Sequence, residues 1–315
     1  MRAVQFDGEL RLESSYPDPQ ITGDQALIKV RCAGICNTDI ELIKGYMGFS
    51  GILGHEFVGE VIAGSDALIG QRVVGEINVA DGDCEFCKCG IPSQCVDRVT
   101  VGIDRHNGAF ADQLALTVRN LHKVPDNVSD TAAVFVEPLA AALQVTEAVH
   151  ISPRNRVVII GAGKLGMLVA QILKLTGADM AVVVRREKQA RLLQKWGISA
   201  MERSELPDNS ADAVVDCTGV ADGFADALTL VKSRGVIVLK STYVNLPQAD
   251  LTRVVVDEIR VIGSRCGPFD SALRLLIANL VDVESLVEAR YGLDDAIKAI
   301  DHASKKGVLK ILLDV

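Results

Sequence analysis

The stretch Arg156-Val-Val-Ile-Ile-Gly-Ala-Gly-Lys-Leu-Gly166 decides the fold of this 315-residue chain. Its run of four aliphatic residues is typical of a strand that is buried on both faces. The glycines that follow have the spacing Gly161-x-Gly163-x-x-Gly166, and apolar residues then recur at helical spacing until Gly177. A second aliphatic run at 181–184 completes a strand–helix–strand unit.

Each glycine of this motif has its own role in binding a dinucleotide. Gly161 makes the tight turn, Gly163 lets the backbone approach a pyrophosphate, and Gly166 lets the helix lie close to the strand. The helix start, with Lys164 and Leu165, offers free N–H groups and a partial positive charge to the phosphates. A lone glycine triplet is often an ordinary turn. Here a strand precedes the glycine triplet and a helix follows it, and this arrangement predicts a dinucleotide site.

The composition restricts the class of protein and its partners. Hydrophobic residues make up 49%, which excludes disorder, and the length suits two domains. A net charge of −8 argues against nucleic acid or an anionic membrane as a partner. No apolar targeting segment or membrane-spanning run is present, so we expect a cytoplasmic protein. Four of the eight cysteines lie between Cys84 and Cys95, and this clustering favours metal over disulfides.

Residues 1–124 have the pattern of a β domain, in which short apolar segments are separated by turn residues. The pattern predicts an antiparallel barrel or sandwich. Two groups in this region, Gly34-Ile-Cys36-Asn-Thr38-Asp39 and Gly54-His55-Glu56, contain side chains that bind metals. A catalytic zinc needs three protein ligands and an open position. Taken singly, Cys36 is better explained as a small buried residue, and His55 as a hydrogen-bonded turn residue.

A third candidate ligand, Glu137, lies far along the chain in the apolar segment Phe135-Val-Glu-Pro-Leu-Ala-Ala-Ala142. A carboxylate in such a segment needs a partner, because an unpaired buried charge is costly. A metal would supply that partner. A helix N-terminus before Pro138 or a buried salt bridge would do the same.

These motifs, in this order, resemble those of the zinc-dependent medium-chain dehydrogenases, the alcohol and polyol dehydrogenase superfamily. The likeness runs from Cys-x-Thr-Asp through Gly-His-Glu, a cysteine-rich lobe and Glu-Pro-Leu-Ala to the Rossmann fingerprint. It implies an α/β protein with a GroES-like β-rich catalytic domain at 1–137, to which 264–315 return. The cofactor domain, a doubly wound parallel sheet, would occupy 138–263. The resemblance also implies a homodimer or homotetramer formed through the cofactor domain.

The resemblance assigns roles residue by residue. Cys36 and His55 match the catalytic zinc ligands, and Glu137 stands where the family has its third ligand. Glu56 matches a glutamate that can replace water or Glu137 in the zinc shell. Thr38 matches the hydroxyl that takes the proton of the bound alcohol, and the same hydroxyl would suit a helix cap.

One position departs from the family pattern. Many members have a histidine five residues after Cys36, where this chain has Glu41. A similar order occurs in the aldose (glucose) dehydrogenase branch, which points to a polyhydroxylated substrate. A solvated helix position explains Glu41 equally well.

The cysteine-rich lobe follows the family's structural-zinc spacing. Asp81 stands where the first cysteine usually lies, and Cys84, Cys87 and Cys95 follow. A four-sulfur site that uses Cys89 instead of Asp81 is the alternative. We prefer Asp81, since only one residue separates Cys87 from Cys89. A lobe without metal is less favoured, because exposed reduced thiols oxidise.

The residues 138–263 alternate strand and helix patterns, as in an open parallel sheet. Ligands bind at the carboxyl ends of such strands, where Cys217, Thr218 and Ser241 are expected. Arg185 and Arg186 follow the second strand, where NAD enzymes place an acidic side chain. Guanidinium groups bind a 2′-phosphate through charge-assisted bonds, so we predict NADP(H) over NAD(H). Two solvated charges at a helix start are the alternative.

The resemblance also places a basic residue of the final strand near the cofactor pyrophosphate, and Lys310 matches that position. Together, the motifs predict a zinc-dependent, NAD(P)-dependent alcohol dehydrogenase that acts on a small alcohol, polyol or sugar. A zinc-independent quinone or enoyl-type reductase of the same superfamily is one alternative. A non-catalytic protein that binds a dinucleotide is the other.

Overall fold

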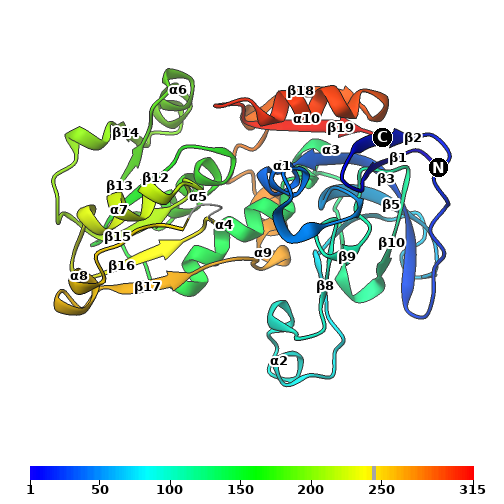
Figure 1. The fold of residues 1–315 in the computed structure, drawn as a ribbon, viewed down its shortest axis with the longest axis horizontal. Helices are drawn as coiled ribbons and strands as arrows, with labels where there is room; N and C mark the ends of the chain where they lie inside the picture. The colour runs from blue at the N-terminus through cyan, green and yellow to red at the C-terminus, as the bar shows by residue number, and fades with distance from the viewer. Residues whose placement is uncertain (243–245) are drawn as a thin grey trace. The chain divides into compact units, whose positions relative to one another are not determined.

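The computed structural model describes residues 1–242 and 246–315, and the chain divides into two compact units (Figure 1). Unit 1 comprises Met1–Glu137 and Phe269–Val315, and unit 2 comprises Pro138–Pro268. The sequence placed the return to unit 1 after residue 263, which is five residues too early. The segment before Pro268 packs within unit 2, where a Cβ on Gly267 would lie 2.0 Å from the carbonyl oxygen of Ala140.

The main sheet of unit 1 has the order β11-β6-β5-β3-β19-β18, and β10 pairs with β3. Its strands are β3 (Gln25–Ile35), β5 (Glu56–Ala63), β6 (Arg72–Gly75), β10 (Gln113–Thr117), β11 (Leu121–Lys123), β18 (Val287–Gly292) and β19 (Lys310–Asp314). The first half of β3 alternates buried and more exposed residues, which is the pattern of a sheet with one face on the core. The final strand, β19, lies antiparallel to β3, so the C-terminal segment completes this sheet.

Two small sheets and several short helices surround this sheet. One sheet has the order β2-β1-β4, and the other has the order β7-β8-β9. Their strands are β1 (Ala3–Phe6), β2 (Leu10–Glu13), β4 (Gly51–Ile52), β7 (Asn78–Val79), β8 (Val99–Val101) and β9 (Arg105–His106). The helices of unit 1 are α1 (Asn37–Ile43), α2 (Glu85–Lys88), α3 (Asp130–Ala133), α9 (Phe269–Ile277) and α10 (Ala296–Ser304). The 3-10 helices are Tyr46–Gly48, Pro92–Gln94, Val118–Asn120, Glu284–Leu286 and Leu293–Asp295.

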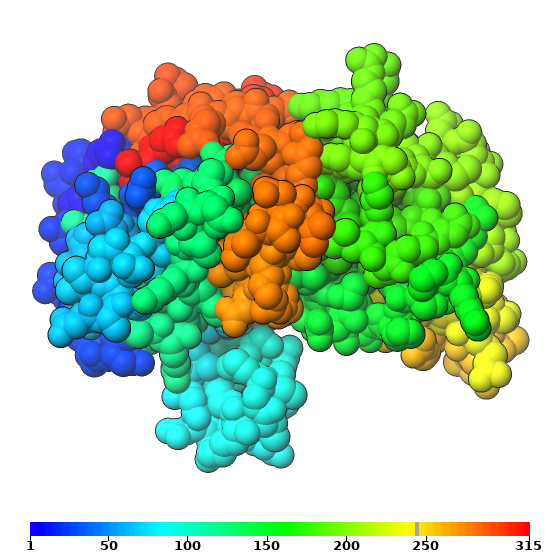
Figure 2. All heavy atoms as spheres, turned by 180° about the vertical axis from the view of Figure 1, so that it is seen from behind, coloured from blue at the N-terminus to red at the C-terminus, as the bar shows by residue number. Residues whose placement is uncertain are grey.

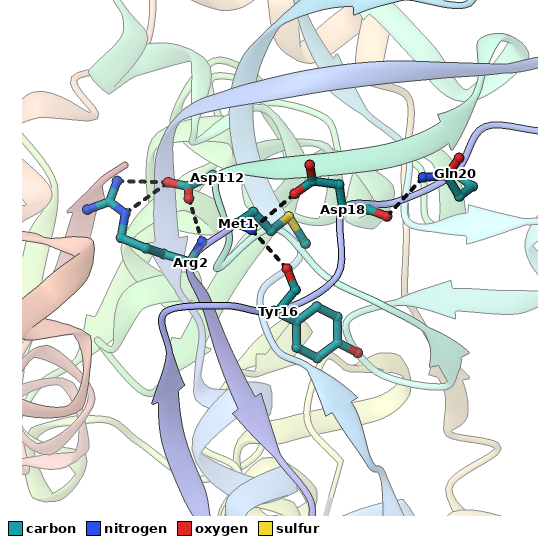
Figure 3. A network of polar contacts seen from close by, with 6 residues as sticks. All are labelled: Met1, Arg2, Tyr16, Asp18, Gln20 and Asp112. Carbon is teal, nitrogen blue, oxygen red and sulfur yellow. Dashed lines mark hydrogen bonds and ion pairs between the residues drawn. The ribbon is translucent and has the colours of Figure 1, made fainter.

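A polar network fixes the first strand (Figure 3). The N-terminal amine of Met1 donates to the carbonyl oxygen of Tyr16 at 2.8 Å and to Oδ1 of Asp18 at 3.0 Å. Nη2 of Arg2 donates to Oδ1 of Asp112 at 2.7 Å, and the backbone N–H of Arg2 donates to Oδ2 of the same carboxylate. Asp112 immediately precedes β10, so this network ties β1 to the main sheet.

Unit 2 is built on a six-stranded parallel sheet of order β14-β13-β12-β15-β16-β17. Its strands are β12 (Arg156–Ile160), β13 (Asp179–Val183), β14 (Ser199–Met201), β15 (Ala211–Asp216), β16 (Val231–Leu239) and β17 (Arg260–Gly263). The helices are α4 (Val136–Ala148), which begins in unit 1, α5 (Lys164–Lys174), α6 (Glu187–Lys195), α7 (Ala221–Leu230) and α8 (Leu251–Val256), with a 3-10 helix at Arg203–Glu205. This strand order is that of a doubly wound dinucleotide fold.

The predicted α/β fold, with one β-rich unit and one parallel-sheet unit, is confirmed. The residues 157–160 of β12 are all buried, as a strand covered on both faces must be. The sequence reading missed β14, a short strand that starts on an exposed serine and lacks a continuous apolar run. No helix in the described part of the chain is long and apolar enough to cross a membrane.

Candidate functional site

Three metal-binding side chains meet beyond the end of β3. The Sγ atom of Cys36, a ring nitrogen of His55 and a carboxylate oxygen of Glu56 all lie within 4.8 Å of one another. The pairing of β3 with β5 brings them together, because its register sets Gly34 opposite Glu56. His55 and Glu56 are buried and Cys36 is partly exposed. We call these three residues the inner cluster.

Two glycines make room for the inner cluster. A Cβ on Gly34 would lie 2.4 Å from Oε2 of Glu56 and 2.8 Å from a methyl carbon of Val134. Gly54 has φ +95° and lies against the ring of Phe110, which a Cβ would approach to 2.3 Å. A larger residue at either position would therefore displace a neighbour of the cluster.

Asp39 orients the cluster, although the sequence analysis gave it no role. It is fully buried in the first turn of α1, and its Oδ2 accepts from the backbone N–H of Cys36 at 2.8 Å. Its Oδ1 lies 3.3 Å from Nδ1 of His55. A carboxylate beside one ring nitrogen fixes the orientation of a metal-binding histidine. Its position three residues after Cys36, as in a capping box, is the sequence signal that could have identified it.

The donor atoms of the cluster fit a cation. Among the described residues, Oε1 of Glu56 is buried without a hydrogen-bond partner, whereas Oδ1 of Asp39 and Nδ1 of His55 lie 3.3 Å from each other. A buried oxygen such as Oε1 costs about 1–3 kcal/mol unless something satisfies it. Burial opposes a charge on His55, but Asp39 and Cys36 raise its pKa well above the ordinary value, so the local field favours positive charge. Sulfur, nitrogen and carboxylate donors together suit zinc.

Lys310 lies beside the inner cluster, and its predicted role at the cofactor pyrophosphate stays a prediction. It is buried, and its Nζ pairs with Oε2 of Glu56 and lies 5.7 Å from the ring centroid of Phe135. Burial opposes its charge, but Glu56, Cys36 and Glu137 raise its pKa. The pairing of β19 with β3 explains this position, because it sets the next residue, Ile311, opposite the end of β3.

Glu137, the predicted third ligand, is not among the three residues whose donor atoms converge. It is the second residue of α4 and is half-buried. Its charge contributes to the raised pKa of Lys310, which lies beside Glu56. Glu56 therefore occupies the third position of the cluster in this structure.

The two remaining predicted catalytic residues lie on α1. Oγ1 of Thr38 is 3.7 Å from Sγ of Cys36, so this hydroxyl adjoins the inner cluster. Glu41 instead accepts from Nζ of Lys44 at 3.0 Å, and the lysine is exposed. An ion pair at this spacing runs along a helix surface, as the solvated-position interpretation of Glu41 predicts.

A second group of metal-binding side chains lies in the lobe around α2. One donor atom from each of Asp81, Cys84, Cys87 and Cys95 lies within 4.8 Å of the others. The two Sγ atoms of Cys84 and Cys87 are 3.5 Å apart, and Sγ of Cys87 lies 3.4 Å from Oδ1 of Asp81. Cys89 is exposed and does not belong to this group. We call these four residues the lobe cluster.

The lobe cluster is more exposed than the inner cluster. Figure 2 shows the lobe, in cyan, standing out from the other atoms of its own unit. Backbone N–H groups of Asp83 and Cys84 bind the carboxylate of Asp81 and lower its pKa to about 2. The aspartate is thus held as an anion beside the thiols, as a closed cation site requires.

The glycine motif of unit 2 has the geometry of a phosphate-binding turn. Gly161 has φ +98°, and a Cβ there would lie 2.9 Å from the backbone of Cys217. A Cβ on Gly166 would lie 1.8 Å from the carbonyl oxygen of Gly161, so the helix packs against the turn. By contrast, a Cβ on Gly163 would meet no atom within 4 Å, which leaves open space at the start of α5.

The predicted cofactor residues lie at the carboxyl ends of neighbouring strands. Asp216 is fully buried at the end of β15, and its Oδ1 accepts from both the backbone N–H and the hydroxyl of Thr218, at 2.8 and 2.7 Å. Burial raises the pKa of Cys217 to about 12, so its thiol is neutral. Arg185 and Arg186 follow β13 and are both exposed.

Two family models match the chain. The alcohol dehydrogenase GroES-like domain matches residues 22–126, and the zinc-binding dehydrogenase model matches residues 165–281. The first match covers the inner cluster, and the second runs from the start of α5 through the strands β13 to β17. The chain belongs to the medium-chain alcohol dehydrogenase superfamily.

Similar proteins extend this result along almost the whole chain. A sorbitol dehydrogenase of Halalkalibacterium halodurans is 29% identical over 94% of this chain and 93% of its own length. A D-arabitol-phosphate dehydrogenase of Enterococcus avium is 27% identical over 94% of this chain and 91% of its own length.

Two solved structures share both the fold and more than a quarter of the sequence. A zinc-binding dehydrogenase of Sinorhizobium meliloti, bound to NADP, has a TM-score of 0.89 at 26% identity and covers 100% of this chain and 99% of its own. An alcohol dehydrogenase of Thermus sp. ATN1 has a TM-score of 0.88 at 26% identity, with full coverage of both chains.

Membership of this superfamily confirms the resemblance drawn from the motifs, and unit 1 is the GroES-like domain. The chain is an NAD(P)-dependent oxidoreductase, with a Rossmann-type sheet in unit 2. The motifs did not predict that Asp39 would lie beside His55, or that Lys310 would pair with Glu56.

Proposed function

We propose that this chain is a zinc-dependent dehydrogenase that oxidises a hydroxyl of a polyol or sugar, or reduces the corresponding carbonyl, with NADP(H) preferred over NAD(H). The observation that carries the proposal is the inner cluster, in which sulfur, nitrogen and oxygen donors converge and the buried Oε1 of Glu56 lacks a hydrogen-bond partner. The similarity to a sorbitol dehydrogenase and a D-arabitol-phosphate dehydrogenase supports the substrate class.

Cys36 and His55 would hold the catalytic zinc, with Glu56 or Glu137 as the acidic ligand. When bound, zinc polarises the substrate oxygen and lowers the pKa of its hydroxyl. Oδ1 of Asp39 lies 3.3 Å from Nδ1 of His55, so Nε2 would be the nitrogen that binds the metal. The pairing of Lys310 with one oxygen of Glu56 leaves Oε1 as the donor without a hydrogen-bond partner.

Thr38 is the proposed proton acceptor. Its Oγ1 adjoins Sγ of Cys36, so a substrate oxygen at the cluster would lie within reach of the hydroxyl. The hydroxyl would relay the proton, accepting it from the substrate oxygen and donating its own proton to solvent, as hydride leaves for the nicotinamide. Because Glu41 pairs with Lys44 on the helix surface, we give Glu41 no part in this transfer.

The proposed preference for NADP rests on Arg185 and Arg186. Both are exposed just after β13, where a doubly wound sheet faces the adenosine ribose. The NADP bound to the Sinorhizobium meliloti protein supports this choice. The Arg185→Asp substitution should weaken NADP binding at least about tenfold, the effect of one lost charge-assisted bond, and affect NAD binding less. Equal losses for the two cofactors would contradict the preference.

The lobe cluster is proposed as a structural zinc site made by Asp81, Cys84, Cys87 and Cys95. The structure brings these four donors together while Cys89 remains exposed outside the group. A closed set of four protein donors is the arrangement of a structural rather than a catalytic zinc.

We also propose that two copies of the chain associate through unit 2. β17 is the last strand in its sheet order and leaves one edge unpaired among the described residues. Exposed apolar side chains accompany this edge, with Val255 75% and Val256 72% exposed on α8. An unpaired edge beside apolar surface favours pairing with another chain. A monomer in light scattering at micromolar concentration would contradict this proposal.

The proposed function is tested by assaying sorbitol, D-arabitol, aldoses and simple alcohols with NADP⁺ and NAD⁺, on protein purified without chelator. We expect turnover of a polyol or sugar that is lost after zinc removal and regained with added zinc. Turnover of quinones or enones that does not depend on zinc would indicate the zinc-independent reductase. Dinucleotide binding without turnover of any substrate would indicate a non-catalytic protein.

A further inference from the structure

Lys240 lies at the carboxyl end of β16 and bonds two other segments of unit 2. Its Nζ donates to the carbonyl oxygen of Ala141 at 2.6 Å, to the carbonyl oxygen of Arg265 at 2.9 Å and to Oγ of Ser264 at 3.2 Å. A lysine ammonium has three N–H donors, which these three acceptors match in number. Ala141 belongs to α4, whereas Ser264 and Arg265 follow β17.

The backbone of Lys240 and the side chain of the next residue extend these bonds to β15. The N–H of Lys240 donates to the carbonyl oxygen of Asp216, the last residue of β15, at 2.9 Å. Oγ of Ser241 accepts from the backbone N–H of Gly219 at 2.8 Å and donates to the same carbonyl of Asp216 at 3.4 Å. Two consecutive residues therefore hold the carboxyl ends of β15, β16 and β17 in fixed positions.

The place of these strand ends in the sheet indicates what they face. In a doubly wound fold of this strand order, the dinucleotide lies across the carboxyl ends, with one mononucleotide over each half of the sheet. The open turn at Gly163 marks the pyrophosphate position, and Arg185 follows a strand of the adenosine half. The strand ends that Lys240 joins therefore belong to the nicotinamide half.

We propose that Lys240 is a positioning residue for the nicotinamide half of the dinucleotide. It acts through Ser264, Arg265 and Ala141, which its ammonium group binds, and not by contacting the cofactor. Loss of the ammonium would remove three bonds at once and loosen the attachment of residues 264 and 265 to α4. The inference rests on the proposed function only in that the chain binds a nicotinamide dinucleotide.

The Lys240→Met substitution tests this role, because methionine keeps an unbranched apolar stem and removes all three donors. NADPH binding is measured by fluorescence titration, and binding of 2′-phospho-ADP-ribose, which lacks nicotinamide, is measured by calorimetry. NADH and ADP-ribose are measured in parallel. We expect NADPH affinity to fall about tenfold or more, with affinity for 2′-phospho-ADP-ribose changed by less than about twofold. Lys240→Arg should restore part of the NADPH affinity.

Two further variants keep the test decisive. Lys232→Met removes a lysine from the opposite end of β16, where it pairs with Asp212, and should leave both affinities unchanged. Ser264→Ala removes one acceptor and should cause a smaller loss of the same kind, which carries the test if Lys240→Met does not fold.

Two outcomes would overturn the positioning role while leaving the proposed function intact. One is an equal loss of NADPH and 2′-phospho-ADP-ribose binding in the Lys240→Met protein, which would mean general support of unit 2. The other is unchanged binding of both probes in that protein. If the unsubstituted protein bound neither NADPH nor NADH, the positioning role and the proposed function would both fail.

Discussion

The inner cluster and the lobe cluster have similar donor atoms but are assembled in opposite ways. The inner cluster joins Cys36 to His55 through the pairing of two long strands, and buried neighbours hold it from several sides. The lobe cluster comes from a single segment, from Asp81 to Cys95, with little regular structure around it. The fold therefore assembles the inner cluster, whereas an ion bound at the lobe cluster would hold the lobe in its folded form.

The largest expected effect is the loss of turnover in a Cys36→Ala protein. Removing a zinc ligand should lower kcat/KM by about a thousandfold or more, because the metal supplies several kcal/mol of transition-state stabilisation. The strand pairing does not depend on this thiol, so the circular dichroism spectrum should be unchanged. Steady-state kinetics on the best polyol substrate measures the effect. A Cys36→Ala protein that turns over normally would remove the distinction between the two clusters.

The converse change is Cys87→Ala in the lobe cluster. Structural zinc contributes on the order of 10 kcal/mol to the folding of small zinc-bound segments, so its loss should unfold the lobe. We expect fast amide exchange and proteolytic cleavage confined to residues 81–95, and zinc still bound at the inner cluster. Cys89→Ala is the matched control, because this thiol lies outside the group. If the lobe of both variants exchanged its amides and was cleaved equally fast, the zinc site that uses Asp81 instead of Cys89 would be contradicted.

A third prediction concerns the buried pair of Lys310 and Glu56. In zinc-free protein, Lys310→Met leaves the buried carboxylate of Glu56 without a cation, which should reduce the free energy of unfolding by about 3–5 kcal/mol. Chemical denaturation measures this loss. The double variant Lys310→Met with Glu56→Gln should recover part of it, because both charges are then gone. If the double variant were as unstable as the sum of the two single variants, the pair would not act as a unit.

The smallest effect is expected at the base of the lobe, where His122 binds Glu76 and Asp270. Its ring nitrogens lie 2.9 Å from Glu76 and 2.8 Å from Asp270, and Glu76 is just before the strand that leads to the lobe. Burial opposes protonation of His122, but the two carboxylates outweigh it and raise its pKa above the ordinary value. The folded state therefore binds the proton more tightly than the unfolded state does.

The resulting stabilisation is complete below the ordinary pKa of histidine, about 6.5, and is lost as pH rises through the higher folded pKa. Because both carboxylates are partly exposed, we expect about 0.5–1 kcal/mol. The His122→Gln variant should lack this contribution. The denaturation midpoints of the unsubstituted and His122→Gln proteins should then converge as pH rises from 6 to 9. A difference between the midpoints that did not change with pH would contradict the raised pKa of His122.

The sequence predicted the elements whose signals are local. The glycine motif and its flanking strand and helix predicted unit 2, because a few neighbouring residues determine the turn geometry and the helical spacing. The donors Cys36 and His55 and the lobe donors were found through motif order and spacing. In the lobe, a short segment of chain contains Asp81, Cys84 and Cys87. Their side chains can therefore lie in few positions relative to one another, so their convergence could be predicted.

The contact of Lys310 with Glu56 was not predicted, because it depends on long-range strand pairing. Its place beside Glu56 follows from the register of β19 on β3, and no local pattern sets which strands pair. Asp39 was passed over for a related reason, since a carboxylate in a first helical turn usually serves only as a cap. Its second partner, His55, becomes its neighbour only when β3 and β5 pair.

Anomalous diffraction at the zinc edge, from crystals of protein purified without chelator, tests the catalytic zinc site most directly. We predict one peak within zinc-binding distance, about 2.0–2.3 Å, of Sγ of Cys36 and a ring nitrogen of His55. A second peak is predicted among the donors of Asp81, Cys84, Cys87 and Cys95. A map in crystals grown with ample zinc that has no peak beside Cys36 and His55 would contradict the central claim.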